Sequence, residues 1–114
     1  MIMENIAVAK NNNVRVSTRK VRLVADSIRK LSAEKALAIL ATLGKRGAYS
    51  LDKTLQSAVA NATSKGMSRE RLIIESLEVN EGPALKRFRP STRGRVHPYK
   101  KRTSKITIIL KEKN

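Results

Sequence analysis

The sequence contains no cysteine, no tryptophan and few aromatic residues of any kind. Without cysteine, the chain can form neither a disulfide nor a thiolate zinc site, and it cannot use a cysteine nucleophile. This absence fits a reducing, intracellular compartment. Aromatic residues are only 3% of the chain, so the core must be built from aliphatic side chains. A hydrophobic content of 40% makes such a core feasible and separates the chain from wholly disordered basic tails.

Acidic residues are also scarce. The chain has 9 Asp and Glu against 25 Lys and Arg, which gives a formal net charge of +16 and an isoelectric point of about 11.1. Self-repulsion of this size opposes a compact state unless a polyanion neutralises it. Phosphate backbones are the most abundant polyanions. Nucleic acid is therefore the first expected partner, and an anionic membrane surface is the second.

Long apolar runs and catalytic motifs are missing. The longest apolar run spans residues 36–41, far short of the roughly 20 residues that a membrane span needs. The first five residues do not resemble a secretory signal, so we expect a cytoplasmic protein with no membrane partner. No glycine-rich phosphate loop, zinc-ligand spacing or nucleophile elbow occurs, and His97 is the only histidine. We expect no enzyme activity, no metal and no cofactor.

Apolar periodicity predicts three amphipathic helices, over residues 18–30, 33–43 and 48–65. The residues expected to begin or end these helices are Ser17 and Ser32 as N-caps, Gly44 as the C′ residue of the second, and Gly66 at the end of the third.

Three strands are also expected. One lies within residues 4–16, interrupted by a turn at Asn11–Asn13. The others span residues 71–79 and 105–111, and we expect them to pair antiparallel. The predicted fold class is α+β: three helices packed on a small antiparallel sheet, with a long protruding basic β-hairpin. Residues 1–114 would form a single domain, with residues 80–104 as the hairpin.

The basic charge is concentrated near the C-terminus. Residues 82–111 contain ten Lys and Arg and no acid. Eight of these cations fall within residues 86–102, and burying them against the body would cost far more than the few apolar side chains return. We therefore expect the segment to project as two arms, with Gly94 between Arg93 and Arg95 at the tip. Arginine side chains with forked donors and a flat face suit folded RNA.

Several residues in this sequence allow two interpretations. Phe88 and Tyr99 either stack on unpaired bases or form a hydrophobic brace across the hairpin. The cations around the first helix either bind RNA or form a solvated helix face. Acids at positions 75, 78 and 81 are more simply explained by salt bridges than by a two-metal nuclease site, which needs more carboxylates brought together.

Longer motifs resemble one family, the large-subunit ribosomal protein twenty-two family. The segments that carry the resemblance are residues 79–90 (VNEGPALKRFRP), 93–95 (RGR), 101–104 (KRTS), 16–26 (VSTRKVRLVAD) and 57–62 (SAVANA). The resemblance implies a small α+β domain on the outside of the large subunit, whose hairpin runs through ribosomal RNA (rRNA) to the wall of the peptide exit tunnel. It implies a tip that helps form the tunnel constriction beside large-subunit protein four, contact with the nascent peptide in transit, and a role in assembly.

The same resemblance carries rRNA contacts over to the hairpin at Lys86, Arg87, Arg89, Arg93 and Arg95, and to the first helix at Arg19, Lys20 and Arg22. With the other basic and aromatic residues of these two segments included, the expected rRNA-binding set is Arg15, Arg19, Lys20, Arg22, Lys86, Arg87, Phe88, Arg89, Arg93, Arg95, Lys100, Lys101 and Arg102.

An architectural DNA-binding protein is the main alternative, because such proteins also use basic two-stranded arms with proline near the tip. Pro90 and Pro98 are compatible with an arm of that kind. That hypothesis also requires a dimer, and the sequence shows no clear dimer seam. A nuclease or RNA-modifying enzyme finds little support in one histidine and scattered acids.

Overall fold

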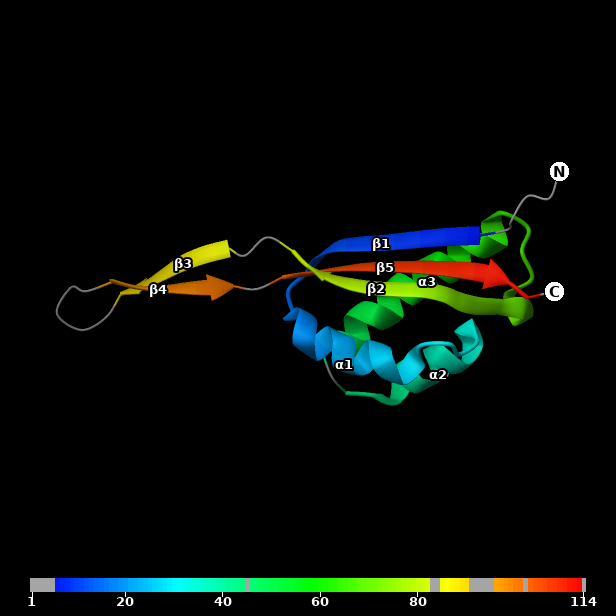
Figure 1. Cartoon of the computed structure of the whole chain (residues 1–114), viewed down its shortest axis with the longest axis horizontal. Coiled ribbons are helices and arrows are strands. Elements are labelled where there is room, and N and C mark those ends of the chain that lie inside the picture. Colours follow the sequence, from blue (N-terminus) through cyan, green and yellow to red (C-terminus); the bar gives the residue numbers. More distant parts are fainter. Residues whose placement is uncertain (1–5, 45, 83–84, 91–95, 102, 114) are drawn as a thin grey trace.

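A computed structural model describes residues 6–44, 46–82, 85–90, 96–101 and 103–113. The elements in chain order are β1 (Ile6–Val14), α1 (Thr18–Ile28), α2 (Ala33–Thr42), α3 (Arg46–Ser64), a short 3₁₀ turn (Arg69–Arg71), β2 (Leu72–Glu81), β3 (Leu85–Pro90), β4 (Val96–Lys101) and β5 (Ser104–Glu112). The predicted α+β class is confirmed, with three helices against a three-stranded antiparallel sheet (Figure 1). None of the described helices is long and apolar enough to cross a membrane.

Strand β5 is the centre of the sheet, in the order β1–β5–β2, and it pairs antiparallel with both neighbours. The pairing of β2 with β5 agrees with the sequence prediction. Alternation along β5 explains its central place, since Ile106, Ile108 and Leu110 are fully buried on the face that the helices cover. Helix α3 lies behind the strands in Figure 1, and α1 and α2 pack beside it.

The turn predicted at Asn11–Asn13 is wrong, because β1 continues through all three asparagines. The strand has a register irregularity against β5, where Asn11 pairs with Ile106 but Val14 pairs with Ser104. One extra residue on β1 is thus absorbed as a bulge, which keeps the strand in the sheet. The side chain of Asn11 accepts a hydrogen bond from the backbone N–H of Asn13 at 3.2 Å.

Helix α1 buries the stripe that its period predicts, formed by Val21, Val24, Ala25 and Ile28. It ends two residues earlier than expected, and Lys30 just beyond it has a φ of 67°, a left-handed conformation. Left-handed residues often terminate helices, but the position is usually glycine. The sequence gives no sign of this ending because a lysine occupies the position.

The other helix ends differ in how well they follow the sequence. Ser32 caps α2 as expected, its side chain accepting a hydrogen bond from the Lys35 N–H at 3.3 Å, whereas the Ser17 side chain makes no capping bond. Gly44 directly follows Leu43, the C-cap residue of α2, and its φ is not positive. Gly66 has a φ of 84°, and the Met67 N–H donates to the Ala62 carbonyl at 3.0 Å, so α3 ends as predicted in a Schellman motif.

Strands β3 and β4 form a separate two-stranded ribbon, paired antiparallel from Leu85 with Lys101 to Pro90 with Val96. The ribbon extends beyond the body as a continuation of β2 and β5 (Figure 1). At its root, the Gly82 N–H donates to the Thr103 carbonyl at 3.0 Å, which continues the strand pairing past the end of the sheet. The prediction of a protruding hairpin is confirmed.

Candidate nucleic-acid interface

The pairing of the ribbon places cations of the two strands at the same level. Lys86 lies opposite Lys100, and Arg87 lies opposite Tyr99. Like charges directly across a strand pair repel each other, so the opposition of Lys86 and Lys100 favours a counter-charge supplied from outside. Phe88 lies opposite Pro98, so Phe88 and Tyr99 are not a directly opposed cross-strand pair, and the choice between base stacking and a hydrophobic brace stays a prediction.

The expected rRNA-binding residues of the hairpin divide into two groups. Those in the paired strands are Lys86, Arg87, Phe88 and Arg89 of β3 and Lys100 and Lys101 of β4. The expected tip (Arg93, Gly94 and Arg95) and Arg102 lie outside the described residues.

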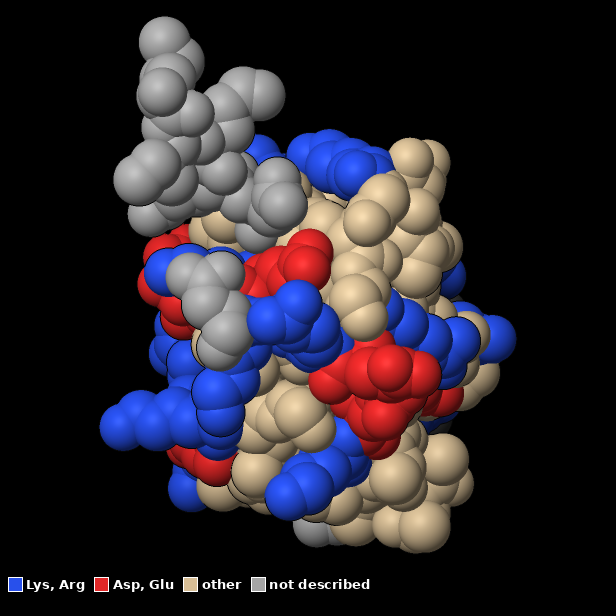
Figure 2. All heavy atoms as spheres, turned by 90° about the vertical axis from the view of Figure 1, so that its right-hand side faces the viewer, with Lys and Arg blue, Asp and Glu red and all other residues tan. Residues whose placement is uncertain are grey.

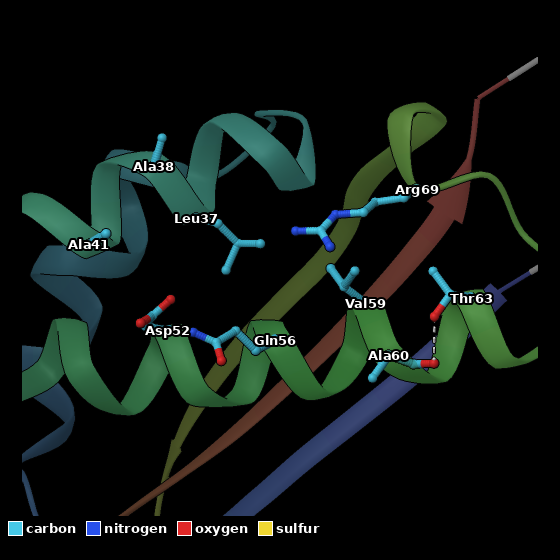
Figure 3. A pocket seen from close by; sticks show the side chains of 9 residues that line it. All are labelled: Leu37, Ala38, Ala41, Asp52, Gln56, Val59, Ala60, Thr63 and Arg69. Atoms are coloured by element: carbon cyan, nitrogen blue, oxygen red, sulfur yellow. Dashed lines mark hydrogen bonds between the residues drawn. The ribbon is translucent and has the colours of Figure 1, made fainter.

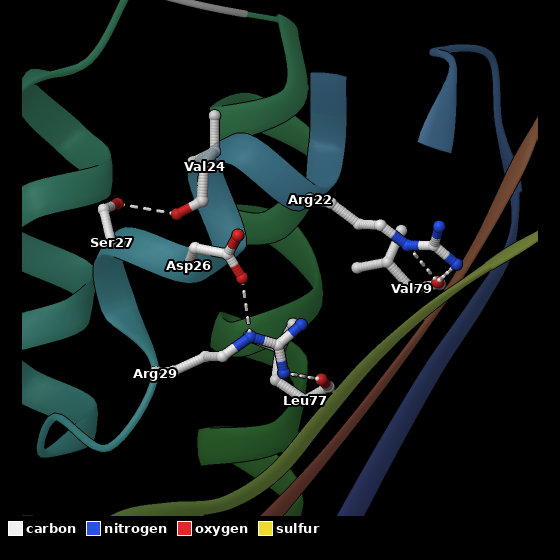
Figure 4. A network of polar contacts seen from close by, with 7 residues as sticks. All are labelled: Arg22, Val24, Asp26, Ser27, Arg29, Leu77 and Val79. Carbon is white, nitrogen blue, oxygen red and sulfur yellow. Dashed lines mark hydrogen bonds and ion pairs between the residues drawn. The ribbon is translucent and has the colours of Figure 1, made fainter. Parts of the chain in front are cut away.

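The expected cations around α1 are exposed, but they are not equivalent. The side chains of Arg15, Arg19 and Lys20 make no hydrogen bond or ion pair within the part of the chain that the structure describes. Arg22 instead donates from Nε and Nη2 to the Val79 carbonyl, at 3.0 and 2.7 Å (Figure 4). Its guanidinium joins α1 to β2, which leaves Nη1 and the second hydrogen of Nη2 to reach an external phosphate.

Arg29 is a second arginine of this region that binds a carbonyl of β2, and the sequence did not predict this contact. Its Nη1 donates to the Leu77 carbonyl, and its Nε contacts Asp26 Oδ1 at 2.9 Å (Figure 4). Leu77 and Val79 are two residues apart on an edge strand, so both guanidiniums cover outward-facing carbonyls. The sequence holds no local signal for this contact, because Arg29 and Leu77 are 48 residues apart.

The opposite edge of the sheet is covered in the same way. Asn61 Nδ2 donates to the Val8 carbonyl and Lys65 Nζ donates to the Ile6 carbonyl, both at 3.0 Å. Residues four apart on a helix thus meet carbonyls two apart on β1, because the two spacings are each about 6–7 Å. Unpaired edges invite other strands, so these side chains leave little room for a partner that would add a strand to the sheet.

The described carboxylates do not neutralise the predicted interface. Their ion pairs are Asp26 with Arg29 at 2.9 Å, Glu34 with Arg69 at 3.9 Å and Glu112 with Arg71 at 3.9 Å. Among the described residues, the acids at positions 75, 78 and 81 form no ion pair, contrary to our expectation. At the end of the body away from the ribbon, Lys and Arg are mixed with Asp and Glu (Figure 2).

A groove between α2 and α3 is one of the concave features of the described residues. Leu37 and Val59 line its middle, Asp52 lies toward one end and Arg69 toward the other (Figure 3). No group of three or more potential metal ligands occurs in the part of the chain that the structure describes. The groove therefore combines an apolar middle with one acid and one base toward its opposite ends.

Comparison with known proteins decides the family. Residues 9–111 match the sequence profile of the family described as Ribosomal protein L22p/L17e. The chain belongs to this family. It is therefore a protein of the large ribosomal subunit, in a family of structural ribosomal proteins and not of enzymes. As an L22p/L17e protein it is ribosome-bound in the cytoplasm, as the sequence predicted.

Individual L22p/L17e relatives cover nearly the whole chain. The large ribosomal subunit protein uL22 of Thermus thermophilus is 52% identical over 113 residues, which is 98% of each chain. The uL22 protein of Mycoplasma mobile is 52% identical over 100 residues, or 87% of this chain and 91% of the relative. That of Pediococcus pentosaceus is 46% identical over 108 residues, or 94% and 92%. The resemblance found in the sequence motifs is confirmed.

Proposed function

We propose that this L22p/L17e protein binds large-subunit rRNA through its ribbon and the exposed cations that precede and begin α1. The observation that carries the proposal is the ribbon itself: a strand pair rich in cations that lies beyond the body, with Lys86 directly opposite Lys100. Such a pair is stabilised when phosphates lie along it, because each neutralised phosphate also releases counterions. The extended shape and positive charge of the ribbon suit folded RNA as a partner better than they suit an acidic protein.

The finer placement follows from the family resemblance. Residues 1–114 would act as one domain, with residues 80–104 as the hairpin that passes between rRNA segments. Its tip, at Arg93, Gly94 and Arg95, would line the peptide exit tunnel near protein four and meet the nascent peptide in transit. By joining several rRNA segments, the protein would support assembly of the subunit.

Co-sedimentation tests this proposal. The full chain, with a photo-crosslinking residue in place of Arg93, is incubated with large subunits that lack the native copy and then washed with high salt. We expect retention in the subunit and crosslinks to rRNA around the tunnel. Loss of the protein in the wash, or crosslinks confined to the outer surface of the subunit, would refute the placement.

Competition with duplex DNA tests the architectural DNA-binding alternative. If the protein is built for rRNA, excess duplex DNA leaves most of the rRNA complex intact at physiological salt. Displacement of rRNA by an equal mass of duplex DNA would favour the alternative instead.

A further inference from the structure

Tyr49 is an exposed aromatic ring in a chain that has almost none. Its exposed fraction is 66%, and the whole sequence contains one Phe and two Tyr. It lies in the first turn of α3, at a position where the buried residues are its neighbours Ala48 and Leu51. Packing therefore does not account for an aromatic residue here, since the ring faces solvent while the helix contacts the core through other positions.

Cations surround this ring. A shallow hollow next to it is lined by Arg15, Val16, Arg46, Tyr49 and Ser50, with no acid among them. Lys53, one turn further along α3, places its Nζ 5.5 Å from the centre of the Tyr49 ring. Two arginines from different parts of the chain thus line the same hollow as the ring, and a lysine lies over the ring.

The surrounding packing fixes the position of the hollow. A Cβ on Gly47 would lie 3.3 Å from the Lys20 carbonyl oxygen, so the starts of α1 and α3 pack almost backbone to backbone. On the other side, the Ser104 hydroxyl donates to the Val16 carbonyl. Ser104 begins β5 at the point where the chain returns from the ribbon. The hollow therefore lies close to the point where the chain returns from the ribbon to the body.

We propose that this hollow binds one unpaired nucleotide of rRNA, with its base stacked on Tyr49 and its flanking phosphates on Arg15 and Arg46. Unpaired bases stack on aromatic side chains, and guanidiniums supply forked donors to phosphate oxygens. The apolar wall is limited to Val16 beside the ring, which is too little to anchor a peptide side chain. The proposal rests on the proposed rRNA binding and extends its footprint from the ribbon onto the body.

Affinity for a large-subunit rRNA transcript, measured by filter binding with the full chain, tests the stacking. Tyr49→Leu is expected to weaken binding by roughly 5- to 150-fold, the range for losing one stacked base. Tyr49→Phe keeps the ring and is expected to bind within about twofold of the unchanged protein. The matched control is Leu23→Ala, which alters another large side chain that is also 66% exposed, on α1, and should leave affinity unchanged.

The salt dependence of binding tests the phosphate contacts that we assign to the arginines of the hollow. Arg46→Gln is expected to lower the slope of log affinity against log salt by about one phosphate contact, whereas Tyr49→Leu leaves the slope unchanged. Arg69→Gln, in the 3₁₀ turn that follows the far end of α3, is the control and should change neither.

A spectroscopic measurement keeps the test independent of folding. In a Tyr99→Phe background, 3-fluorotyrosine labels Tyr49 alone, and its ¹⁹F resonance should shift when single-stranded oligoribonucleotide is added but not when RNA duplex is added. An unshifted resonance, or full affinity in Tyr49→Leu, would overturn the nucleotide site while leaving rRNA binding by the ribbon in place. If the unchanged chain fails to bind rRNA at all, the proposed function falls and the nucleotide site falls with it.

Discussion

Both Nε and Nη2 of Arg22 donate to one acceptor, the carbonyl oxygen of Val79, 57 residues away in the chain. The bond joins the exposed side of α1 to the edge strand β2, a short distance before the strand leads into the ribbon. Arg22 therefore has a structural role in the free protein, whatever its third nitrogen group contacts on the ribosome.

Replacing Arg22 with methionine should destabilise the fold. The variant keeps much of the side-chain stem but removes both hydrogen bonds, and we expect a loss of about 1–2 kcal/mol in the free energy of unfolding. Urea denaturation measures it as a lower midpoint at an unchanged slope. Arg19→Met is the control, because Arg19 has no partner among the described residues, and it should stay within about 0.5 kcal/mol. Equal stability of the two variants would contradict the structural role.

Opening a sheet edge should promote self-association. In the double variant Arg22→Met/Arg29→Met, the outward carbonyls of Leu77 and Val79 lose their donors, so another strand can pair there. We expect concentration-dependent dimers or larger species in sedimentation velocity, while the unchanged protein stays monomeric under the same conditions. A matched double variant, Arg19→Met/Arg46→Met, removes the same charge without touching an edge. Association in both variants alike would show that charge loss, and not the edge, is responsible.

The left-handed residue after α1 gives a prediction in the stabilising direction. Lys30 has a φ of 67°, which costs an L-residue about 1 kcal/mol and glycine almost nothing. Lys30→Gly should therefore raise the melting temperature by a few degrees. Lys35→Gly, on the exposed side of α2, is the control and should lower it by a similar amount. A lower melting temperature for Lys30→Gly would mean that the left-handed ending is not formed in solution.

The root of the ribbon depends on the absence of a side chain at Gly82. A Cβ there would lie 2.5 Å from the Thr103 hydroxyl oxygen, a distance that real contacts do not tolerate. Gly82→Ala should therefore destabilise the protein by about 1–3 kcal/mol, as overpacking does elsewhere. In a Thr103→Ala background the same change should cost less, because the clashing oxygen is gone. A double-mutant cycle measures the difference, and additive effects would rule out the close contact.

The sequence predicted those parts of the fold whose signals are local or periodic. Alternation from 105 to 111 placed Ile106, Ile108 and Leu110 on the buried face. The cation density of residues 86–102 required a segment outside the core, and strands β3 and β4 of this segment lie beyond the body. Both predictions rest on the cost of burying or exposing particular side chains, which depends little on the rest of the chain.

Other features depend on contacts between distant segments, which no local pattern reveals. Three asparagines resemble a turn, but pairing with β5 keeps them in a strand through a bulge. Lys30 has a left-handed backbone conformation, which the residue type lysine does not predict. Arg22 was expected at the RNA interface, yet its main partner is a carbonyl of β2. The cluster of cations at Tyr49 appears only when α3 packs against α1 and the end of β1.

The salt dependence of rRNA binding tests the central claim most directly. The affinity of the full chain for a large-subunit rRNA transcript is measured from low to high salt and compared with a variant in which Arg87, Arg89, Arg93 and Arg95 are glutamine. We expect a steep slope for the unchanged chain, reduced by about 3 in the variant, because each lost phosphate contact lowers it by roughly 0.7–0.9. A slope that corresponds to only one or two phosphate contacts, or the same slope in both proteins, would contradict the claim that the basic ribbon lies among RNA phosphates.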